Sequence, residues 1–234
     1  MDSHRTRAGT PDLAALARLL ADGTRASFCL ALLDGRAWTA AELARHAGVA
    51  ASTATGHLNL LVAGGLLAQE RQGRHRYVRL ADAGTAELIE SLASMAPPCA
   101  ARPGSLSVDS HRQALARART CYDHLAGALG VLITEAMARR GLLDWVQGPA
   151  LTSDGACWFA ALGITLPSAT RRPLVRSCLD WTERRPHLAG TAGAALCSHA
   201  LSSGWITRIG TGRAVALTDA GRNAFQEHLG LVAG

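Results

Sequence analysis

The sequence contains no lysine, no pair of cysteines in CxxC spacing and no apolar run long enough to cross a bilayer. The best candidate run, residues 125–133, is interrupted by glycine, and residues 1–12 lack the apolar core of a signal peptide. We therefore expect a cytoplasmic protein without a membrane partner. In that compartment its six scattered cysteines should stay free thiols rather than form disulfides.

Signatures of enzyme chemistry are absent as well. The chain has neither a glycine-rich cofactor loop nor the glycine-flanked serine of a nucleophile elbow. A methyltransferase or a hydrolase would need one of these two motifs. We therefore expect a protein that is not an enzyme and that has no catalytic residues.

Arginine carries the fixed positive charge of this chain. With 24 arginines and 18 acidic residues, the 234-residue chain has a formal charge of +6. Residues 1–95 hold ten arginines and nine acids, so the net charge does not mark this part as basic. The local distribution does, because one predicted hairpin is crowded by Arg71, Arg74, His75, Arg76 and Arg79. Such a density suits a phosphate backbone, although a solvated pair of strands would show the same pattern.

Residues 39–80 begin with the signals of two helices joined by a tight turn. Thr39 and Glu42 fit a capping box at the start of a helix over residues 40–47. Gly48 has the conformational freedom that a tight turn after this helix requires. The first half of a helix-turn-helix is therefore predicted here.

The second helix and a hairpin complete the motif. Ser52 is the expected cap of the second helix, and Gly64–Gly65 end it. Two β-rich runs, 66–71 and 76–80, then flank a turn that contains glycine. This order predicts a winged helix-turn-helix, a motif that places its second helix in the major groove of DNA.

The segment upstream of this motif resembles the opening of ArsR/SmtB-type repressors. The family's Leu-Ala-Asp-x-Thr-Arg pattern is matched here by Leu20, Ala21, Asp22, Thr24 and Arg25. The similarity extends over residues 13–92. It implies a repressor that binds double-stranded operator DNA as a homodimer, with the helices over 13–20 and 82–94 forming the dimer contact.

The residues expected to contact DNA lie on the second helix and on the hairpin. Small polar side chains on the helix can reach base edges or phosphates, and basic side chains on the hairpin can reach phosphates or the minor groove. The helix candidates are Ser52, Thr53, Thr55, His57 and Asn59. The hairpin candidates are Arg71, Arg74, His75 and Arg76.

A change of composition separates two domains. Residues 96–110 are rich in proline, serine and alanine, and we interpret them as a linker between domains over 11–95 and 111–234. A long helix, capped by Asp109 or Ser110, is expected to run to about Arg140. It would serve as a dimer contact or as a spine for the second domain.

An internal repeat points to the fold of the second domain. A Leu-x-x-x-Gly cadence followed by a helix occurs at Leu80, Leu151 and Leu217, and a hairpin like the first precedes the last copy. We therefore expect a fold that is mainly α with small β-hairpin wings. In it, a second, degenerate winged-helix-like unit follows the N-terminal winged helix-turn-helix. Its helix is rich in alanine and glycine, which favours dimerisation or effector sensing over DNA binding.

The resemblance does not supply a metal site, because the family's Cys-x-Cys and Asp-x-His motifs have no counterpart in residues 42–46 or 82–95. The second domain instead offers thiols and imidazoles that suit a soft metal site or a reactive thiol, namely Cys121, His124, Cys178 and His187. We expect Cys121 and His124 on one helix face. Nothing in the sequence brings the four together, so the cofactor stays open between a metal ion and none.

The sequence as a whole predicts a DNA-binding transcriptional regulator, a repressor, controlled by an effector through the second domain. The effector is a metal ion, an oxidant or a small organic molecule, the last bound among Trp145, Trp158, Trp181 and Trp205. Cys99 in the linker is a further candidate for oxidation. The alternative is a winged-helix protein-interaction module, against which the arginine-rich hairpin argues.

Overall fold

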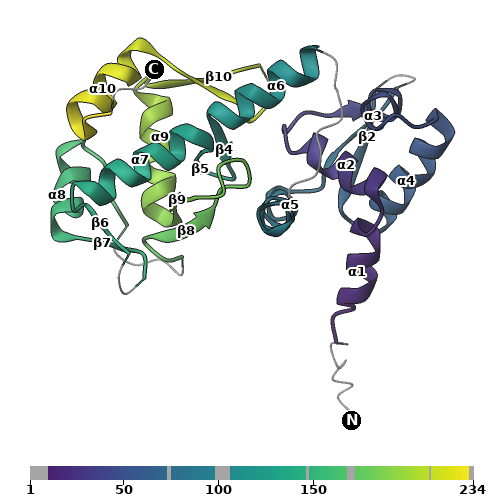
Figure 1. Ribbon diagram of the computed structural model, residues 1–234, viewed down its shortest axis with the longest axis horizontal. Coiled ribbons are helices and arrows are strands. Elements are labelled where there is room, and N and C mark those ends of the chain that lie inside the picture. Colours follow the sequence, from purple (N-terminus) through teal and green to yellow (C-terminus); the bar gives the residue numbers. More distant parts are fainter. Residues whose placement is uncertain are drawn as a thin grey trace, which may run out of the picture. The chain divides into compact units, whose positions relative to one another are not determined.

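The computed structural model divides into two compact units (Figure 1). It describes residues 10–72, 75–97, 106–145, 148–167, 172–210 and 212–231. The first unit comprises the chain up to Leu32 and Ala37–Ala81, and the second comprises Leu33–Arg36 and the chain from Asp82 onward. No helix in the described part of the chain combines the length and apolar character that a membrane crossing requires.

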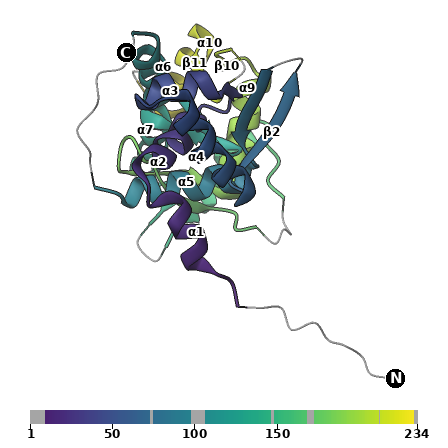
Figure 2. The same cartoon turned by 90° about the vertical axis from the view of Figure 1, so that its right-hand side faces the viewer.

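The first unit is a winged helix-turn-helix, as the sequence predicted. Its elements are α1 (Leu13–Leu20), α2 (Gly23–Leu32), β1 (Trp38–Thr39), α3 (Ala40–Ala47), α4 (Ala51–Ala63), β2 (Leu67–Gln72) and β3 (His75–Leu80). The strands form an antiparallel sheet in the order β1-β3-β2, and the two long strands of the hairpin can be followed in Figure 2. Phe28, Leu43, Leu58 and Leu61 are fully buried and hold the helices on this sheet.

Local chemistry fixes the turn between α3 and α4. The Thr39 hydroxyl accepts a hydrogen bond from the Glu42 backbone N–H, and the Glu42 carboxylate accepts one from the Thr39 N–H. Gly48 ends α3 with φ 68°, which glycine adopts at little cost. The expected cap of α4 is wrong: the cap residue is Ala50, which makes no side-chain hydrogen bond, and Ser52 lies within the helix.

The second unit begins with two helices. Asp82 caps α5 (Ala83–Met95) by accepting a hydrogen bond from the Thr85 backbone N–H. The next helix is α6 (Leu106–Arg117). Residues 98–105 of the predicted linker, with Cys99, lie outside the described residues, and residues 106–110 form the first part of α6.

The predicted long helix up to Arg140 is wrong. The chain leaves α6 after Arg117, forms the hairpin of β4 (Arg119–Cys121) and β5 (His124–Ala126), and only then enters α7 (Gly127–Arg139). All six strand residues are buried, although Arg119, Thr120 and His124 are polar, so no alternation of buried and exposed positions separates these short strands from a helix. The turn is made by Tyr122 with φ 58°, an unusual conformation for a bulky residue.

Two copies of one sequence pattern build the rest of the second unit. Residues 119–130 read RTCYDHLAGALG and residues 176–193 read RSCLDWTERRPHLAGTAG, so Arg-x-Cys-x-Asp, then His-Leu-Ala-Gly-x-x-Gly, occurs twice. The second copy has six extra residues between Asp180 and His187. Each copy continues into a second hairpin and a second helix.

The elements of the two copies correspond one to one. After β4, β5 and α7, the first copy has β6 (Leu143–Asp144), β7 (Ala150–Leu151) and α8 (Ser153–Ala161). The second copy has β8 (Arg176–Leu179), β9 (Pro186–Ala189), α9 (Gly190–Ser202), β10 (Ile206–Arg208), β11 (Val215–Leu217) and α10 (Asp219–Leu229). The hairpin and helix predicted near the C-terminus are therefore present, as β10–β11 and α10.

The two copies pack crosswise around one hydrophobic core. Helix α9 packs on β5 and α7 packs on β9, so each helix covers the hairpin of the other copy. Glycine permits this approach: a Cβ added at Gly193 would lie 3.2 Å from Cβ of His124, and one at Gly130 would lie 3.7 Å from Cβ of His187. The two hairpins are thereby brought into contact at β5 and β9.

Candidate DNA-binding surface and Cys–His cluster

Helix α4 buries one side and leaves polar side chains on the other. Ala54, Leu58 and Leu61 are fully buried against the first unit. The exposed polar side chains are those of Ser52, Thr53, Thr55 and Asn59. Because Ser52 does not cap the helix, its hydroxyl is not committed to the helix start. All four of these predicted contact residues are therefore accessible to a partner.

His57 differs from its neighbours on α4, because its side chain is half-buried and lies against α2. Its Nδ1 lies 3.4 Å from Nη1 of Arg25 and 3.7 Å from the Asp22 carboxylate. Asp22 also accepts a hydrogen bond from the Arg25 backbone N–H, which lowers the pKa of this carboxyl. The Asp and Arg of the Leu-Ala-Asp-x-Thr-Arg pattern thus hold α4 on α2, through His57.

The hairpin supplies positive charge beside α4. Arg71 and Arg76 are directly opposed across β2 and β3, and like charges in such a pair repel each other. Arg76 Nη1 donates a hydrogen bond of 2.8 Å to Oδ1 of Asn59 on α4. Arg74 lies outside the described residues; His75 lies at the start of β3, and its side chain is not described. The hydrogen bond joins the hairpin and the exposed face of α4 into one surface.

The four cysteine and histidine candidates of the second unit meet in space. The single donor atoms that Cys121, His124, Cys178 and His187 offer all lie within 4.8 Å of one another. We call this set the Cys–His cluster. The expected helix face is wrong: Cys121 and His124 are directly opposed across β4 and β5, and Cys178 and His187 are opposed in the same way across β8 and β9.

The two hairpins contribute like atoms to the middle of the cluster. Sγ of Cys121 lies 3.9 Å from Sγ of Cys178, and Nε2 of His124 lies 3.1 Å from Nε2 of His187. Both histidines and Cys121 are at most 3% exposed, while Cys178 is half-buried. The cluster therefore lies almost wholly inside the second unit, with one cysteine and one histidine from each copy.

A carboxylate lies close to Nδ1 of each histidine in the Cys–His cluster. Nδ1 of His124 lies 3.3 Å from Oδ1 of Asp123, and Nδ1 of His187 lies 3.4 Å from Oδ2 of Asp180. These aspartates are the Asp of the repeated pattern, which is the signal that could have identified them in the sequence. Both rings have Nδ1 toward a carboxylate and Nε2 toward the cluster, with a hydrogen bond at His124 and only an ion-pair distance at His187.

Asp180 is held in place by further donors. It accepts hydrogen bonds from the Gly127 backbone N–H at 2.7 Å and from Arg119 Nη2 at 3.0 Å, and its other oxygen accepts from Thr182. Burial raises the pKa of this carboxyl, but the charge of Arg119 and the hydrogen bonds outweigh burial and hold the pKa well below its usual range. Asp180 is therefore a buried carboxylate anion.

The two thiols have different surroundings. A hydrogen bond with Cys121 and the two imidazoles lower the pKa of Cys178 far below its ordinary value. The hydrogen bond with Cys178, then burial and the charge of Glu90 raise the pKa of Cys121, whose Sγ lies 2.8 Å from Oε2 of Glu90. The cluster thus contains one thiol that readily becomes a thiolate, which is the form that binds metals.

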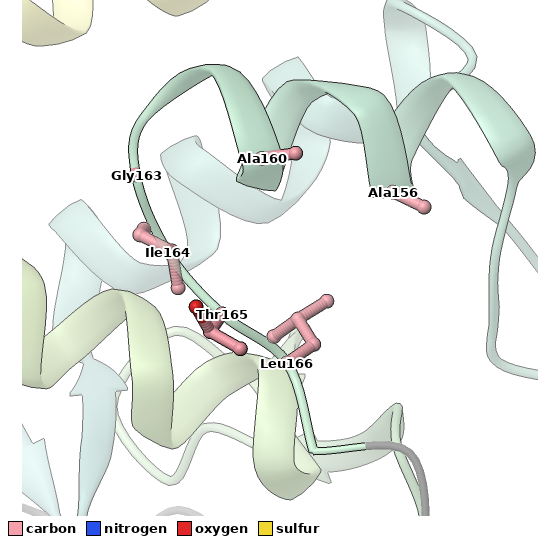
Figure 3. Close-up of a pocket in the computed structure, with 6 residues that line it drawn as sticks. All are labelled: Ala156, Ala160, Gly163, Ile164, Thr165 and Leu166. Atoms are coloured by element: carbon pink, nitrogen blue, oxygen red, sulfur yellow. The ribbon is translucent and has the colours of Figure 1, made fainter.

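Two tryptophans of the second unit, Trp158 and Trp205, are engaged in packing. Trp158 Nε1 donates to the carbonyl of His228, and the ring of Trp205 packs edge-on against Phe225 at 5.3 Å. The pocket in Figure 3, of about 370 Å³, lies between α8 and the segment after it, and its lining residues are Ala156, Ala160, Gly163, Ile164, Thr165 and Leu166. This lining, drawn from the described residues, includes no tryptophan.

Comparison with known proteins places these features in a family. A family model described as "Helix-turn-helix domain" matches residues 20–70. The "Uncharacterized HTH-type transcriptional regulator YdfF" of Bacillus subtilis (strain 168) is 42% identical over 222 residues, which are 94% of this chain and 97% of that protein. The "HTH-type transcriptional regulator CmtR" of Mycobacterium tuberculosis is 39% identical over 80 residues, 34% of this chain and 67% of CmtR.

One solved structure among the matches is described as the "cadmium metal-sensor CMTR from Mycobacterium tuberculosis". It is 34% identical, covers 39% of this chain and 100% of its own, and has a TM-score of 0.32. The similarity to YdfF, by contrast, runs over almost the full length of both chains. Together with the winged helix-turn-helix and the Leu-Ala-Asp-x-Thr-Arg pattern, this similarity shows that the chain belongs to the helix-turn-helix transcriptional regulators of the ArsR type.

Proposed function

We propose that this protein is a cytoplasmic transcriptional repressor that binds operator DNA as a homodimer and responds to an effector through its second unit. The observation that supports DNA binding most directly is the hydrogen bond between Arg76 and Asn59. It joins a basic hairpin to the exposed polar face of α4. A winged helix-turn-helix uses these two surfaces for the DNA backbone and the major groove.

The two surfaces have different roles in this proposal. Ser52, Thr53 and Thr55, near the start of α4, contact base edges or the adjacent phosphates in the major groove. The arginines of the hairpin contact phosphates. Because Arg71 and Arg76 oppose each other, a bound phosphate relieves a repulsion that is present in the free protein. We expect His57 to support α4 rather than to read bases.

Exposed apolar side chains on α1 and α5 support the dimer. Helix α1 has no buried residue and leaves Leu13 73% exposed, and α5 leaves Leu92 44% and Met95 80% exposed. Large apolar side chains in that setting are commonly covered by a partner. We infer that a second copy of this chain covers them, as the resemblance to the ArsR/SmtB family implied. The two α4 helices then read half-sites about 34 Å apart.

We propose domains over residues 11–95 and 111–234, of which the second carries dimerisation or effector control. We infer that it derives from a winged-helix fold, which the order α9, β10–β11, α10 supports. Its hairpin region is poorly suited to DNA, because Arg213 donates to the Leu33 carbonyl and to Glu90. An effector would act by its difference in affinity between the DNA-binding and the released state.

Fluorescence anisotropy with a labelled fragment of the protein's own promoter tests the DNA-binding surface. Arg71→Ala/Arg76→Ala should weaken binding about 100-fold and reduce the slope of log K against log salt by about two, because two phosphate contacts are lost. Arg139→Ala, on α7 and 63% exposed, removes one charge away from the surface and should bind as the wild type does. An unchanged affinity and slope in the double variant would refute this surface and favour a protein-interaction module.

A further inference from the structure

We propose that Cys121, His124, Cys178 and His187 bind one divalent metal ion of the zinc class in tetrahedral geometry, at the junction of the two repeated copies. Each copy supplies one sulfur and one imidazole nitrogen from opposed positions of its first hairpin. The assignment goes beyond the proposed repressor function, because nothing in it depends on DNA binding.

The distances within the cluster fit such an ion. With zinc–sulfur bonds of about 2.3 Å and zinc–nitrogen bonds of about 2.0 to 2.1 Å, a tetrahedral site has S···S near 3.8 Å and N···N near 3.3 Å. The two Sγ atoms lie 3.9 Å apart and the two Nε2 atoms 3.1 Å apart. A disulfide would need about 2.05 Å between the sulfurs. The distances between like atoms are therefore close to those around one tetrahedral ion. The four atoms as a set lie within 4.8 Å of one another, against an S···N distance of about 3.6 Å in such a site, so the two hairpins move slightly closer when the ion binds.

The orientation of the two histidine rings also favours the binding of a cation between them. Nδ1 of His124 is within hydrogen-bond distance of Asp123, and Nδ1 of His187 lies 3.4 Å from the Asp180 carboxylate without a hydrogen bond. A negative charge on that side of each ring favours the proton on Nδ1. With both protons on Nδ1, both Nε2 atoms carry lone pairs and lie 3.1 Å apart, a distance that one ring could otherwise bridge by a hydrogen bond only in the other tautomer. A metal ion between the rings turns this repulsion into two bonds. Carboxylates behind metal-bound histidines also increase the basicity of the ligand.

The ligand types and their burial define the class of ion and its role. Two sulfurs and two imidazoles favour zinc or cadmium over the hard cations magnesium and calcium. Four protein ligands close the coordination sphere, as in structural rather than catalytic zinc sites. Because the ligands come equally from both copies, the ion joins β4–β5 to β8–β9 and stabilises the second unit.

Metal analysis of the full-length protein, purified without chelator and dialysed against zinc-buffered solution, tests the site. We expect one zinc per chain in the wild type and in Cys157→Ser, whose cysteine is exposed and outside the cluster. Cys121→Ser/Cys178→Ser should retain less than a tenth of that amount. Equal zinc in the double variant, or none in the wild type, would overturn the proposal.

Cobalt substitution of the wild type makes the test independent of variant folding. The chelator-treated protein should take up one Co²⁺ per chain and develop the absorption bands of a tetrahedral site with thiolate ligands. An octahedral spectrum without thiolate bands would overturn the proposal. DNA binding measured on the same samples distinguishes the zinc-site proposal from the proposed repressor function. The protein can bind zinc and fail to bind the operator, or bind the operator without holding zinc.

Discussion

At the scale of single residues, the equivalent aspartates of the two copies differ in burial and in the groups that they contact. Asp180 is fully buried, neutralises Arg119 and accepts a backbone hydrogen bond from Gly127 of the other copy. Asp123 is 35% exposed and pairs with Arg172. The six extra residues of the second copy separate Asp180 from its histidine in the chain, which lets the carboxylate reach both His187 and the first copy.

Replacing Asp180 should therefore be far more damaging than replacing Asp123. Asp180→Asn removes the nearer of the two carboxylates, Asp180 and Glu90, that pair with the buried guanidinium of Arg119. We expect a loss of about 3 to 5 kcal/mol in the unfolding free energy of the second unit. Asp123→Asn breaks a partly solvated pair and should cost about 1 kcal/mol or less. Urea unfolding followed by tryptophan fluorescence measures both. Equal losses would contradict the proposed roles of the two aspartates.

The residues of the Cys–His cluster could be named from the sequence, but their meeting could not. Residue types and spacings singled out Cys121, His124, Cys178 and His187. Their convergence depends on the crossed packing of α7 and α9 on the hairpins, a long-range property that no local spacing encodes. The aspartates behind the histidines were missed, although the full repeated pattern contains them.

At the scale of elements, predictions held where local chemistry determines the boundary. The capping box at Thr39, the glycine at 48 and the hairpin after α4 each depend on a few neighbouring residues, and each is observed. The prediction of a helix up to Arg140 was wrong, because β4 and β5 are only three residues long, and all their residues are buried, so they lack the alternation that identifies a strand.

Glycines in the helices of the two units should respond in opposite directions to alanine. Gly193→Ala places a Cβ 2.5 Å from the Leu188 carbonyl and 3.2 Å from Cβ of His124, so α9 must move and the second unit should lose about 2 to 3 kcal/mol. Gly56→Ala, on α4, meets nothing within 4 Å and should gain about 0.5 to 1 kcal/mol. Chemical denaturation of both variants checks the signs, and a stable Gly193→Ala would contradict the close packing of α9.

At the scale of the whole molecule, the two units differ in how far their folds could be predicted from the sequence. The first unit is defined by motifs with a direct physical meaning, so its fold was predictable from the sequence. The second unit is a duplicated fold whose two halves meet at the Cys–His cluster. Association with a second copy of the chain would place two α4 helices, one from each copy, on the two half-sites of an inverted repeat.

Disrupting the exposed apolar side of α1 should separate the dimer without unfolding the chain. Leu13 is 73% exposed, so Leu13→Glu costs the monomer little, while a carboxylate buried in a dimer contact is strongly unfavourable. Sedimentation velocity should show the wild type as a dimer and Leu13→Glu as a monomer at the same micromolar concentration. Operator affinity should fall at least tenfold, because two half-sites are no longer bound by one linked molecule.

A matched variant shows whether this effect is specific to α1. Ile209→Glu places the same charge on a residue that is 42% exposed in the second unit and that belongs to neither proposed dimer helix. It should sediment as the wild type does and retain operator affinity. If Leu13→Glu remains a dimer, the contact does not use α1, and the exposed Leu92 and Met95 of α5 become the part of the interface to test next.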